Sequence, residues 1–224
     1  MDRTALKWKI LLVVIAAPII IGAILFGPAG TLEYWEAWAY MAILFVPVSF
    51  VVLYFLKKDP AFLERRMRTK ENEAMQGLII KVATLIFIVA FIIPGLDHRF
   101  GWSDIQTEII IMADAFVLLG YVLIFLVFRE NSYAGRTVEV EKGQRVISTG
   151  PYSVVRHPMY VGTLVMYLAT PIALGSYVAV PLFILLIPVI VLRILNEEEV
   201  LRHDLPGYAA YCKKTKYRLI PFIW

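Results

Sequence analysis

Six apolar blocks divide the chain. They predict helices near residues 8–28, 36–56, 78–96, 109–128, 158–174 and 177–195. Each block is close to the length of about 17–25 residues that a helix needs to cross a bilayer. The composition agrees, because 60% of the residues are hydrophobic and 18% are charged, against about 45–50% and about 25% in soluble domains. The pattern predicts an all-α, multi-pass integral membrane protein.

The last two blocks form one run, because no charged residue lies between positions 159 and 192. A single helix over this run would be about 50 Å long, and the hydrocarbon core is about 30 Å thick. Gly175-Ser176 interrupts the run near its middle, so we expect a tight helical hairpin and about six spans in total. The first block has the basic start of a signal peptide, but positions 10–32 are uncharged over too long a stretch, which favours a retained helix.

Basic residues alternate along the chain in a way that bears on topology. The seven segments around the blocks hold, in order, 3, 0, 7, 1, 5, 0 and 6 Lys and Arg residues. Cytosolic loops carry the excess of such residues, and placing both termini in the cytosol puts 21 of the 22 there. A five- or seven-span chain would place a basic segment outside. We therefore expect cytosolic termini, with residues 129–157 and 196–218 together at the cytosolic surface.

Two kinds of site are disfavoured. Cys212 is the single cysteine, so no intramolecular disulfide can form. The three histidines show no metal-ligand spacing with it. The net charge of +4 reports loop topology rather than a nucleic-acid surface. We expect no metal site and no nucleic-acid partner.

The densest group of chemically useful residues is the stretch TGPYSVVRHPMYVG, from Thr149 to Gly162. Pro158 suits the first turn of the fifth helix. Arg156 and His157 then lie at the N-terminus of that helix, where free N–H groups and the helix dipole favour an anion. Gly162 permits a close approach. Each residue alone has an ordinary structural role at an interface, but their combination favours a site.

Three carboxylates follow Arg193 at the end of the sixth helix: Glu197, Glu198 and Glu199. If the helix continues into the cytosol, they spread over roughly 200° of its surface, so at least one faces inward. A carboxylate at the bilayer boundary is costly unless it is paired or solvated. Two interpretations stay open: a solvated acidic collar, or a Glu that holds a cationic or hydroxyl-bearing ligand.

A third group of residues runs through Gly207-Tyr208 to the end of the chain. Tyr208 and Tyr211 are three residues apart and share a helical face. By themselves they are typical of an amphipathic interfacial helix with aromatic anchors.

The order of these motifs carries a resemblance. Gly-Pro-Tyr, Arg-His-Pro-Met-Tyr-Val-Gly, an apolar hairpin, a Glu-Glu pair, Gly-Tyr-x-x-Tyr and Arg-x-x-Pro follow one another over roughly residues 129–224. Together they resemble the isoprenylcysteine carboxyl methyltransferase family and its phospholipid methyltransferase relatives. The resemblance implies an S-adenosyl-L-methionine pocket on the cytosolic side, closed by the C-terminal segment. We expect a four-helix transmembrane region in residues 1–128 and the catalytic region in 129–224, within one structural unit.

The resemblance also implies roles for particular residues. Arg193 corresponds to the family's acceptor-side arginine, and His157 is the nearest candidate for a base. The residues implied in binding the methyl donor are Gln144, Arg145, Val146, Ile147, Tyr152, His157, Pro158, Met159, Tyr160 and Glu198. Tyrosine faces suit a sulfonium through cation–π attraction, and a Glu carboxylate can bind a ribose hydroxyl or an ammonium.

Several acceptors fit this resemblance. Partners would be membrane lipids and a lipidic or lipid-linked acceptor, and O-methylation of an isoprenylcysteine-like carboxylate leads by resemblance. A phospholipid amine and a small thiol stay open. A carboxylate needs no general base, whereas a thiol or an amine must first lose a proton.

Two other classes of function are alternatives. Sterol-reductase-type membrane enzymes resemble the C-terminus in Tyr-x-x-Tyr-Cys and Tyr-Arg-Leu-Ile-Pro-Phe, and they would use NADPH. Its 2′-phosphate calls for clustered cations, which the Glu197–Glu199 run disfavours. A non-catalytic scaffold or carrier would show polar residues along an intramembrane pathway. Asp114, in the fourth block, is the one acid whose position suggests burial, and a place near the outer end of its helix explains it.

Overall fold

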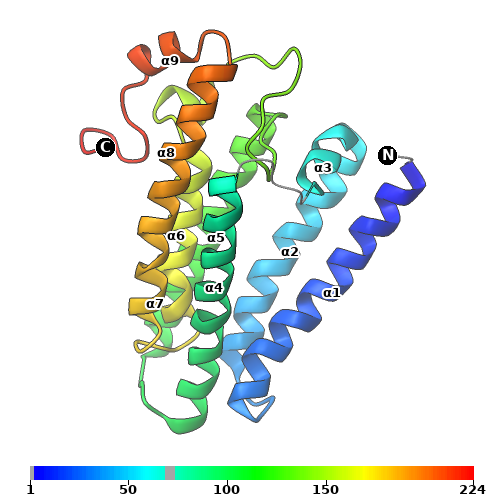
Figure 1. Cartoon of the computed structure of the whole chain (residues 1–224). Helices are drawn as coiled ribbons and strands as arrows, with labels where there is room; N and C mark the ends of the chain where they lie inside the picture. Colours follow the sequence, from blue (N-terminus) through cyan, green and yellow to red (C-terminus); the bar gives the residue numbers. More distant parts are fainter. Residues whose placement is uncertain (1–2, 69–73) are drawn as a thin grey trace.

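The computed structural model describes residues 3–68 and 74–224, and every regular element in these ranges is helical (Figure 1). The elements are α1 (Arg3–Ala29), α2 (Trp35–Lys58), α3 (Pro60–Arg66), α4 (Ala74–Phe100), α5 (Thr107–Glu130), the 3-10 helix η1 (Gly150–Ser153), α6 (Pro158–Ala173), α7 (Val180–Ile184), α8 (Leu186–Asp204) and α9 (Tyr208–Lys214). The predicted all-α class is confirmed over these residues. Lys70 and the side chain of Arg3, both used in the charge count, lie outside what the structure describes.

Five helices are long and apolar enough to cross a membrane. They are Thr4–Ala29, Trp35–Lys58, Met75–Phe100, Thr107–Glu130 and Val180–Asp204, the last of which joins α7 and α8. The sixth candidate, α6, has 16 residues and is therefore about 24 Å long. Because it falls short of the usual length, the count of six spans and the hairpin stay predictions.

The last long helix differs most from its expected bounds of 177–195. The segment after α6 turns at Gly175, which has φ +71°, and helix resumes only at Val180. At the other end α8 continues to Asp204, because Glu198 there meets buried cationic partners. The acidic run is thus carried on a continuing helix rather than at a helix end.

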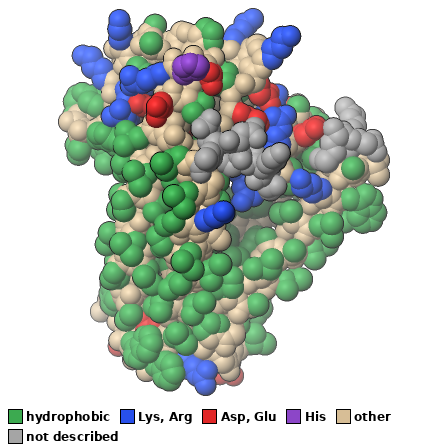
Figure 2. Space-filling view, viewed as in Figure 1, with side chains coloured by type: hydrophobic (Ala, Val, Ile, Leu, Met, Phe, Trp, Pro, Cys, Tyr) green, Lys and Arg blue, Asp and Glu red, His purple; other side chains and the backbone are tan. Residues whose placement is uncertain are grey.

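The outer surface of the helices suits lipid. Large apolar side chains such as Leu12, Ile19 and Leu85 are each 66% exposed, a pattern that in water would mark an interaction surface. Figure 2 shows these apolar side chains along the flank of the helices, while most charged side chains gather at the end that holds α9. The molecule therefore has an apolar belt below a polar end, as an integral membrane protein requires.

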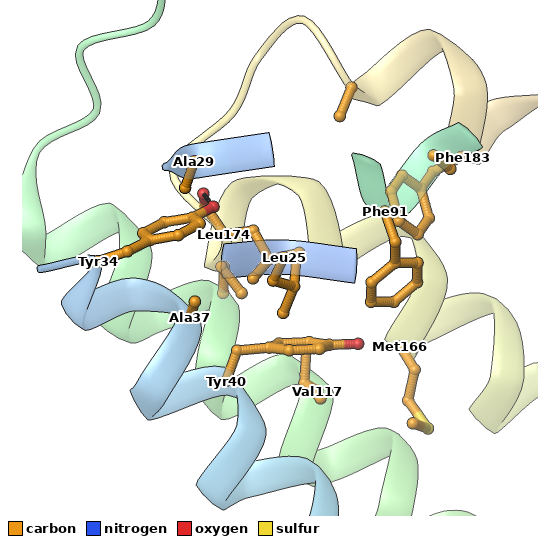
Figure 3. Packing of buried hydrophobic residues seen from close by; sticks show 14 of the residues in the cluster. Leu25, Ala29, Tyr34, Ala37, Tyr40, Phe91, Val117, Met166, Leu174 and Phe183 are labelled. Atoms are coloured by element: carbon orange, nitrogen blue, oxygen red, sulfur yellow. Dashed lines mark hydrogen bonds between the residues drawn. The ribbon is translucent and has the colours of Figure 1, made fainter. Parts of the chain in front are cut away.

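The main apolar core lies toward the opposite end, where α1, α2, α4, α5 and α6 meet (Figure 3). The Tyr34 hydroxyl donates to the Leu174 carbonyl oxygen over 2.6 Å. The Tyr40 and Thr170 hydroxyls lie 3.1 Å apart. These bonds allow tyrosines to be buried without an unsatisfied hydroxyl, and they join α2 to the far end of α6.

The α5–α6 pair packs unusually closely. A Cβ atom placed on Gly162 would lie 2.8 Å from both the Gly120 carbonyl oxygen and Ile124 Cγ1. Small residues let helix backbones approach in membranes. The close approach expected at Gly162 is therefore present, and α5 is the helix that it meets.

A polar cluster ties the far ends of α4 and α6 together. The buried Asp97 carboxylate accepts from the Ser176 hydroxyl over 2.5 Å and from Ser103 over 2.7 Å. Asp114 lies two turns into α5, toward this same end, and is buried. This placement agrees with the expectation that Asp114 lies near the outer end of its helix.

Candidate functional site

A cavity opens at the charged end of the molecule. It has a volume of about 110 Å³. Its walls come from the loop after α5, η1, the start of α6, α8 and α9. Ten of the eleven residues singled out from the sequence line it: Gln144, Arg145, Val146, Ile147, Tyr152, His157, Pro158, Met159, Tyr160 and Arg193. Segments far apart in the chain thus meet at one site.

Glu198 is the exception, because it lies behind the wall. Its Oε1 accepts from Arg156 Nε over 2.7 Å and lies 3.2 Å from His157 Nε2. Its Oε2 accepts from Arg218 Nε over 3.1 Å and from Arg202 Nη2 over 3.3 Å. With 2% of its surface exposed, the carboxylate serves the protein's own cations. The carboxylate at the start of α6, where a ligand anion was expected, is therefore Glu198.

Glu197 is the carboxylate that lines the cavity. One residue corresponds to about 100° of helix rotation, so the two neighbours face different surroundings. Glu197 Oε2 accepts from the Tyr160 hydroxyl over 2.7 Å, and that hydroxyl accepts from Arg193 Nε over 2.9 Å. A chain of Glu197, Tyr160 and Arg193 therefore crosses the cavity wall between α6 and α8.

The C-terminal segment is joined firmly to this wall. The Arg156 and His157 amides donate to the Tyr217 and Arg218 carbonyl oxygens over 2.9 and 3.0 Å. Arg156 Nη1 also donates to the Thr215 and Lys216 carbonyl oxygens. Since Arg156 is buried together with Glu198, the pair holds the start of α6, the end of α8 and residues 215–218 in one arrangement.

Tyrosines form much of the lining. The Tyr152 hydroxyl accepts from Asn131 Nδ2 over 2.9 Å, and Tyr211 donates to the Tyr152 carbonyl oxygen over 2.7 Å. The Tyr208 hydroxyl is buried without a hydrogen-bond partner among the described residues. Burial raises the pKa of Tyr211 to about 12 and raises that of Tyr208 further. Both phenols are thus neutral donors at physiological pH. The hydroxyl hydrogen of Tyr208 has no acceptor among the described residues, so it can be donated to a ligand.

This placement differs from the expected role of α9. Tyr208 and Tyr211 are 4% and 6% exposed and line the cavity, so they are not surface anchors of an interfacial helix. The sequence signal was their shared helical face, which is equally typical of a buried face. Only the packing of α9 against Val146 and Leu201 decides between the two.

Helix α3 fixes the loop that forms another wall. Arg65 Nε donates to Glu141 over 2.9 Å, and Arg68 Nη1 donates to Glu139 and Glu141 over 2.7 and 2.9 Å. Arg66 Nη1 donates to the Gly135 carbonyl oxygen over 2.9 Å. The N-terminal half therefore contributes to the geometry of the site, although its residues carry no motif.

Comparison with known proteins bears on the segment that holds most of these residues. Residues 109–205 match the phospholipid methyltransferase family model. The predicted resemblance to membrane methyltransferases is confirmed over residues 109–205, which we call the phospholipid methyltransferase segment after the family model that they match. It includes the loop after α5, η1, α6 and α8, whereas Tyr208, Tyr211 and the α3 arginines lie outside it.

A second similarity covers a comparable length. The mouse (Mus musculus) protein named Delta(14)-sterol reductase TM7SF2 is 31% identical over an alignment of 105 residues, which covers 43% of this chain and 25% of that protein. The chain therefore spans about a quarter of the length of this relative. The match agrees with the predicted resemblance to sterol-reductase-type membrane enzymes.

A second, apolar cavity adjoins the site on the flank of the helices. It has a volume of about 340 Å³ and lies among α4, α6 and α8. Its walls include Phe87, Leu186 and Ile190, and it shares Tyr160 and Arg193 with the first cavity. The two shared residues thus separate a polar cavity from an apolar groove that faces the lipid side of the molecule.

Proposed function

We propose that this protein is an S-adenosyl-L-methionine-dependent methyltransferase of the membrane, acting on a lipidic or lipid-linked acceptor. The observation that carries the proposal is the pair of adjoining cavities, one polar and one apolar, which share Tyr160 and Arg193. The polar cavity lies largely within the phospholipid methyltransferase segment. This arrangement suits a reaction between a polar donor and an acceptor that arrives from the bilayer.

The polar cavity has groups that fit the methyl donor. The rings of Tyr152, Tyr160 and Tyr208 line it and can attract a sulfonium by cation–π interaction. The Glu197 carboxylate can accept from a ribose hydroxyl or an α-ammonium. The buried Tyr208 hydroxyl can donate to a ligand acceptor, which would remove its unsatisfied state. We therefore assign Glu197, rather than Glu198, to direct contact with the donor.

The donor supplies a methyl group on a positively charged sulfur. Transfer is an in-line displacement in which an acceptor lone pair forms a bond to the methyl carbon as the carbon–sulfur bond breaks. Such a reaction depends mainly on positioning and on exclusion of water. Arg193 would hold the acceptor head group at the junction of the two cavities, while the groove between α4 and α8 would hold its apolar chain.

The acceptor's chemistry decides whether a base is needed. His157 lines the polar cavity, and its Nε2 lies 3.2 Å from Glu198. That contact occupies one of the two ring nitrogens that could take a proton from an acceptor. A carboxylate acceptor avoids the need for a base. We therefore propose an isoprenylcysteine-like carboxylate as the first acceptor to test, before a phospholipid amine or a small thiol.

An NADPH-dependent reductase is the second candidate, favoured by the similarity to the mouse sterol reductase. Arg136 and Arg145 line the polar cavity and could contact a 2′-phosphate. The burial of Glu198 among cations also weakens the electrostatic objection to an anionic cofactor. The same binding experiment distinguishes the two functions.

The test is equilibrium binding of radiolabelled S-adenosyl-L-methionine to the full chain in lipid nanodiscs, with NADPH as competitor. We expect saturable binding that NADPH does not displace and that Glu197→Gln weakens about tenfold, as loss of a charged hydrogen bond would. Glu199→Gln is the matched control on the exposed face. Binding of NADPH in place of the methyl donor would favour the reductase, and binding of neither would reject both enzymes.

A further inference from the structure

A fully buried glutamine lies in the first turn of α4. Gln76 has 0% of its surface exposed, although α4 begins only at Ala74. An amide at such a place must be hydrogen-bonded, since burial without a partner is unfavourable. Its partners therefore show what the side chain does.

Both hydrogen bonds of the Gln76 amide go to one residue. Its Oε1 accepts from Arg193 Nη1 over 2.9 Å, and its Nε2 donates to the Arg193 carbonyl oxygen over 3.2 Å. The Arg193 guanidinium also donates from Nε to the Tyr160 hydroxyl and from Nη2 to the Arg136 carbonyl oxygen. Each nitrogen of the guanidinium is thus directed to a different element.

The contact between Gln76 and Arg193 lies beside the junction of the two cavities. Arg193 and Tyr160 line both cavities, and Gln76 lies one turn before Ile79 and Ile80, which line the apolar groove. The guanidinium therefore stands where an acceptor chain in the groove would meet the polar cavity. Gln76 also precedes the phospholipid methyltransferase segment, which begins at residue 109.

We propose that Gln76 is a positioning residue that sets the direction of the Arg193 guanidinium toward the acceptor head group. This inference rests on the proposed methyltransferase function. An arginine has a long, flexible stem, so a fixed guanidinium loses less freedom on binding a ligand. The amide bonds both ends of the residue, its backbone and its guanidinium, and so limits the torsions between them.

The variant that tests this role is Gln76→Met. Methionine keeps the length, the volume and the helix propensity of glutamine and removes both hydrogen bonds. With S-farnesylcysteine as the acceptor probe, we expect kcat/KM for the acceptor to fall about tenfold or more, while the Kd for S-adenosyl-L-methionine stays within twofold. Gln106→Met, on an exposed residue at the other end of the helices, is the matched control and should match wild type.

A double-mutant cycle separates positioning from simple helix packing. If Gln76 acts through the guanidinium, Gln76→Met should change kcat/KM less than twofold once Arg193→Lys is present. Lysine has no guanidinium for the Gln76 amide to orient. An equal loss in both backgrounds would overturn the proposal and leave Gln76 as a packing residue between α4 and α8.

A second readout requires no acceptor. Phenylglyoxal modifies arginine guanidinium groups, and mass spectrometry of the labelled chain in nanodiscs measures the rate at Arg193. We expect Gln76→Met to raise that rate at least threefold relative to the rate at Arg129, and an unchanged rate would contradict the proposal. If wild type neither binds nor uses S-adenosyl-L-methionine, the proposed function fails, and the labelling comparison still decides whether Gln76 restrains Arg193.

Discussion

Two adjacent carboxylates show how helix rotation separates structural and binding roles. Glu198 is surrounded by Arg156, His157 and Arg218. Glu197, by contrast, lines the cavity and accepts a hydrogen bond from the Tyr160 hydroxyl. The negative charge of Glu198 balances a buried arginine, and removing it would leave the Arg156 guanidinium without its carboxylate partner. Such a loss is strongly destabilising in protein interiors.

We expect Glu198→Gln to destabilise the fold as well as the site. Breaking a buried pair by removing one partner costs about 3–5 kcal/mol. Thermal unfolding in nanodiscs should show a clear drop in Tm for Glu198→Gln, together with loss of S-adenosyl-L-methionine binding. Glu197→Gln should weaken binding at an almost unchanged Tm. Equal Tm values for both variants would show that the Arg156–Glu198 contact does not stabilise the end of the chain.

At the scale of residues, the sequence indicated the members of the site better than their roles. The motif order located ten of the eleven candidates on the cavity wall, because short motifs fix local geometry. It could not decide between Glu197 and Glu198, since that choice depends on the rotation of α8 against α6. Gln76 carried no local signal, because its partner Arg193 is 117 positions away.

Among the elements, α5 and α6 make the close backbone contact on which the position of the cavity wall depends. Gly162 lies one turn after Pro158 and two residues after Tyr160, and both of these residues line the cavity. A side chain there would push α6 away from the Gly120 carbonyl oxygen on α5. A shift at this point would therefore move the cavity wall along with the helix.

Gly162→Ala should consequently lower both stability and binding. Overpacking typically costs about 1–3 kcal/mol, and here the nearest atom is a backbone oxygen that cannot rotate away. The measurement is Tm in nanodiscs, followed by donor affinity. Gly27→Ala is the control, because no atom lies within 4 Å of its added Cβ, and it should be neutral or slightly stabilising. Similar Tm values for the two variants would refute the close-packing argument.

Helix α3 shows what a reading of apolar blocks omits. Residues 57–77 lie between two predicted apolar helices, and the apolar pattern predicts no helix in them. Asp59-Pro60 is nevertheless a typical helix start. The Asp59 side chain accepts from the Phe62 amide over 3.0 Å, which caps α3. This short helix then presents Arg65, and the residues just after it present Arg68, to Glu141 in the loop that lines the cavity.

We predict that Arg65→Ala weakens donor binding without unfolding the chain. Ion pairs that solvent still reaches contribute up to about 1 kcal/mol, and the Arg65 and Glu141 side chains are 19% and 23% exposed, so the Kd should rise by no more than roughly fivefold. The effect should shrink at high salt, because screening already weakens the pair. Lys142→Ala, on an exposed neighbour of Glu141, is the control. A Kd unchanged at low salt would mean that α3 does not order the loop.

Over the whole molecule, hydrogen bonds join α4, α6 and α8 at one end and join α4 to the turn after α6 at the other. Gln76 at the start of α4 bonds Arg193 in α8, and Asp97 near the end of α4 bonds Ser176 just after α6. Arg156, just before α6, meets Glu198 in α8. The segment from 156 to 176 therefore extends over the same depth as α4, even though its helix is shorter than a usual span.

This matched depth leads us to propose that α6 crosses the membrane and that the chain has an even number of spans. In Figure 1 the start of α1 and the helix α9 lie at the same end of the molecule. On the face that Figure 2 shows, most of the Lys and Arg side chains also gather toward that end, as expected for the cytosolic side. The charge pattern alone predicted this arrangement, but it could not show how a short α6 reaches the necessary depth.

Cysteine accessibility tests the orientation directly, since Cys212 is the single native cysteine. In a Cys212→Ser background, single cysteines would replace Lys7, Asp104 or Lys214, all exposed. An impermeant maleimide should label positions 7 and 214 from the cytosolic side and position 104 from the other side.

Labelling of 7 and 214 from opposite sides would mean an odd number of spans. The segment from 156 to 176 would then have to enter and leave the bilayer on one face, which the Asp97–Ser176 contact opposes, because it joins residue 176 to the far end of the long apolar helix α4. The labelling result therefore decides whether the Asp97–Ser176 contact marks the outer membrane surface.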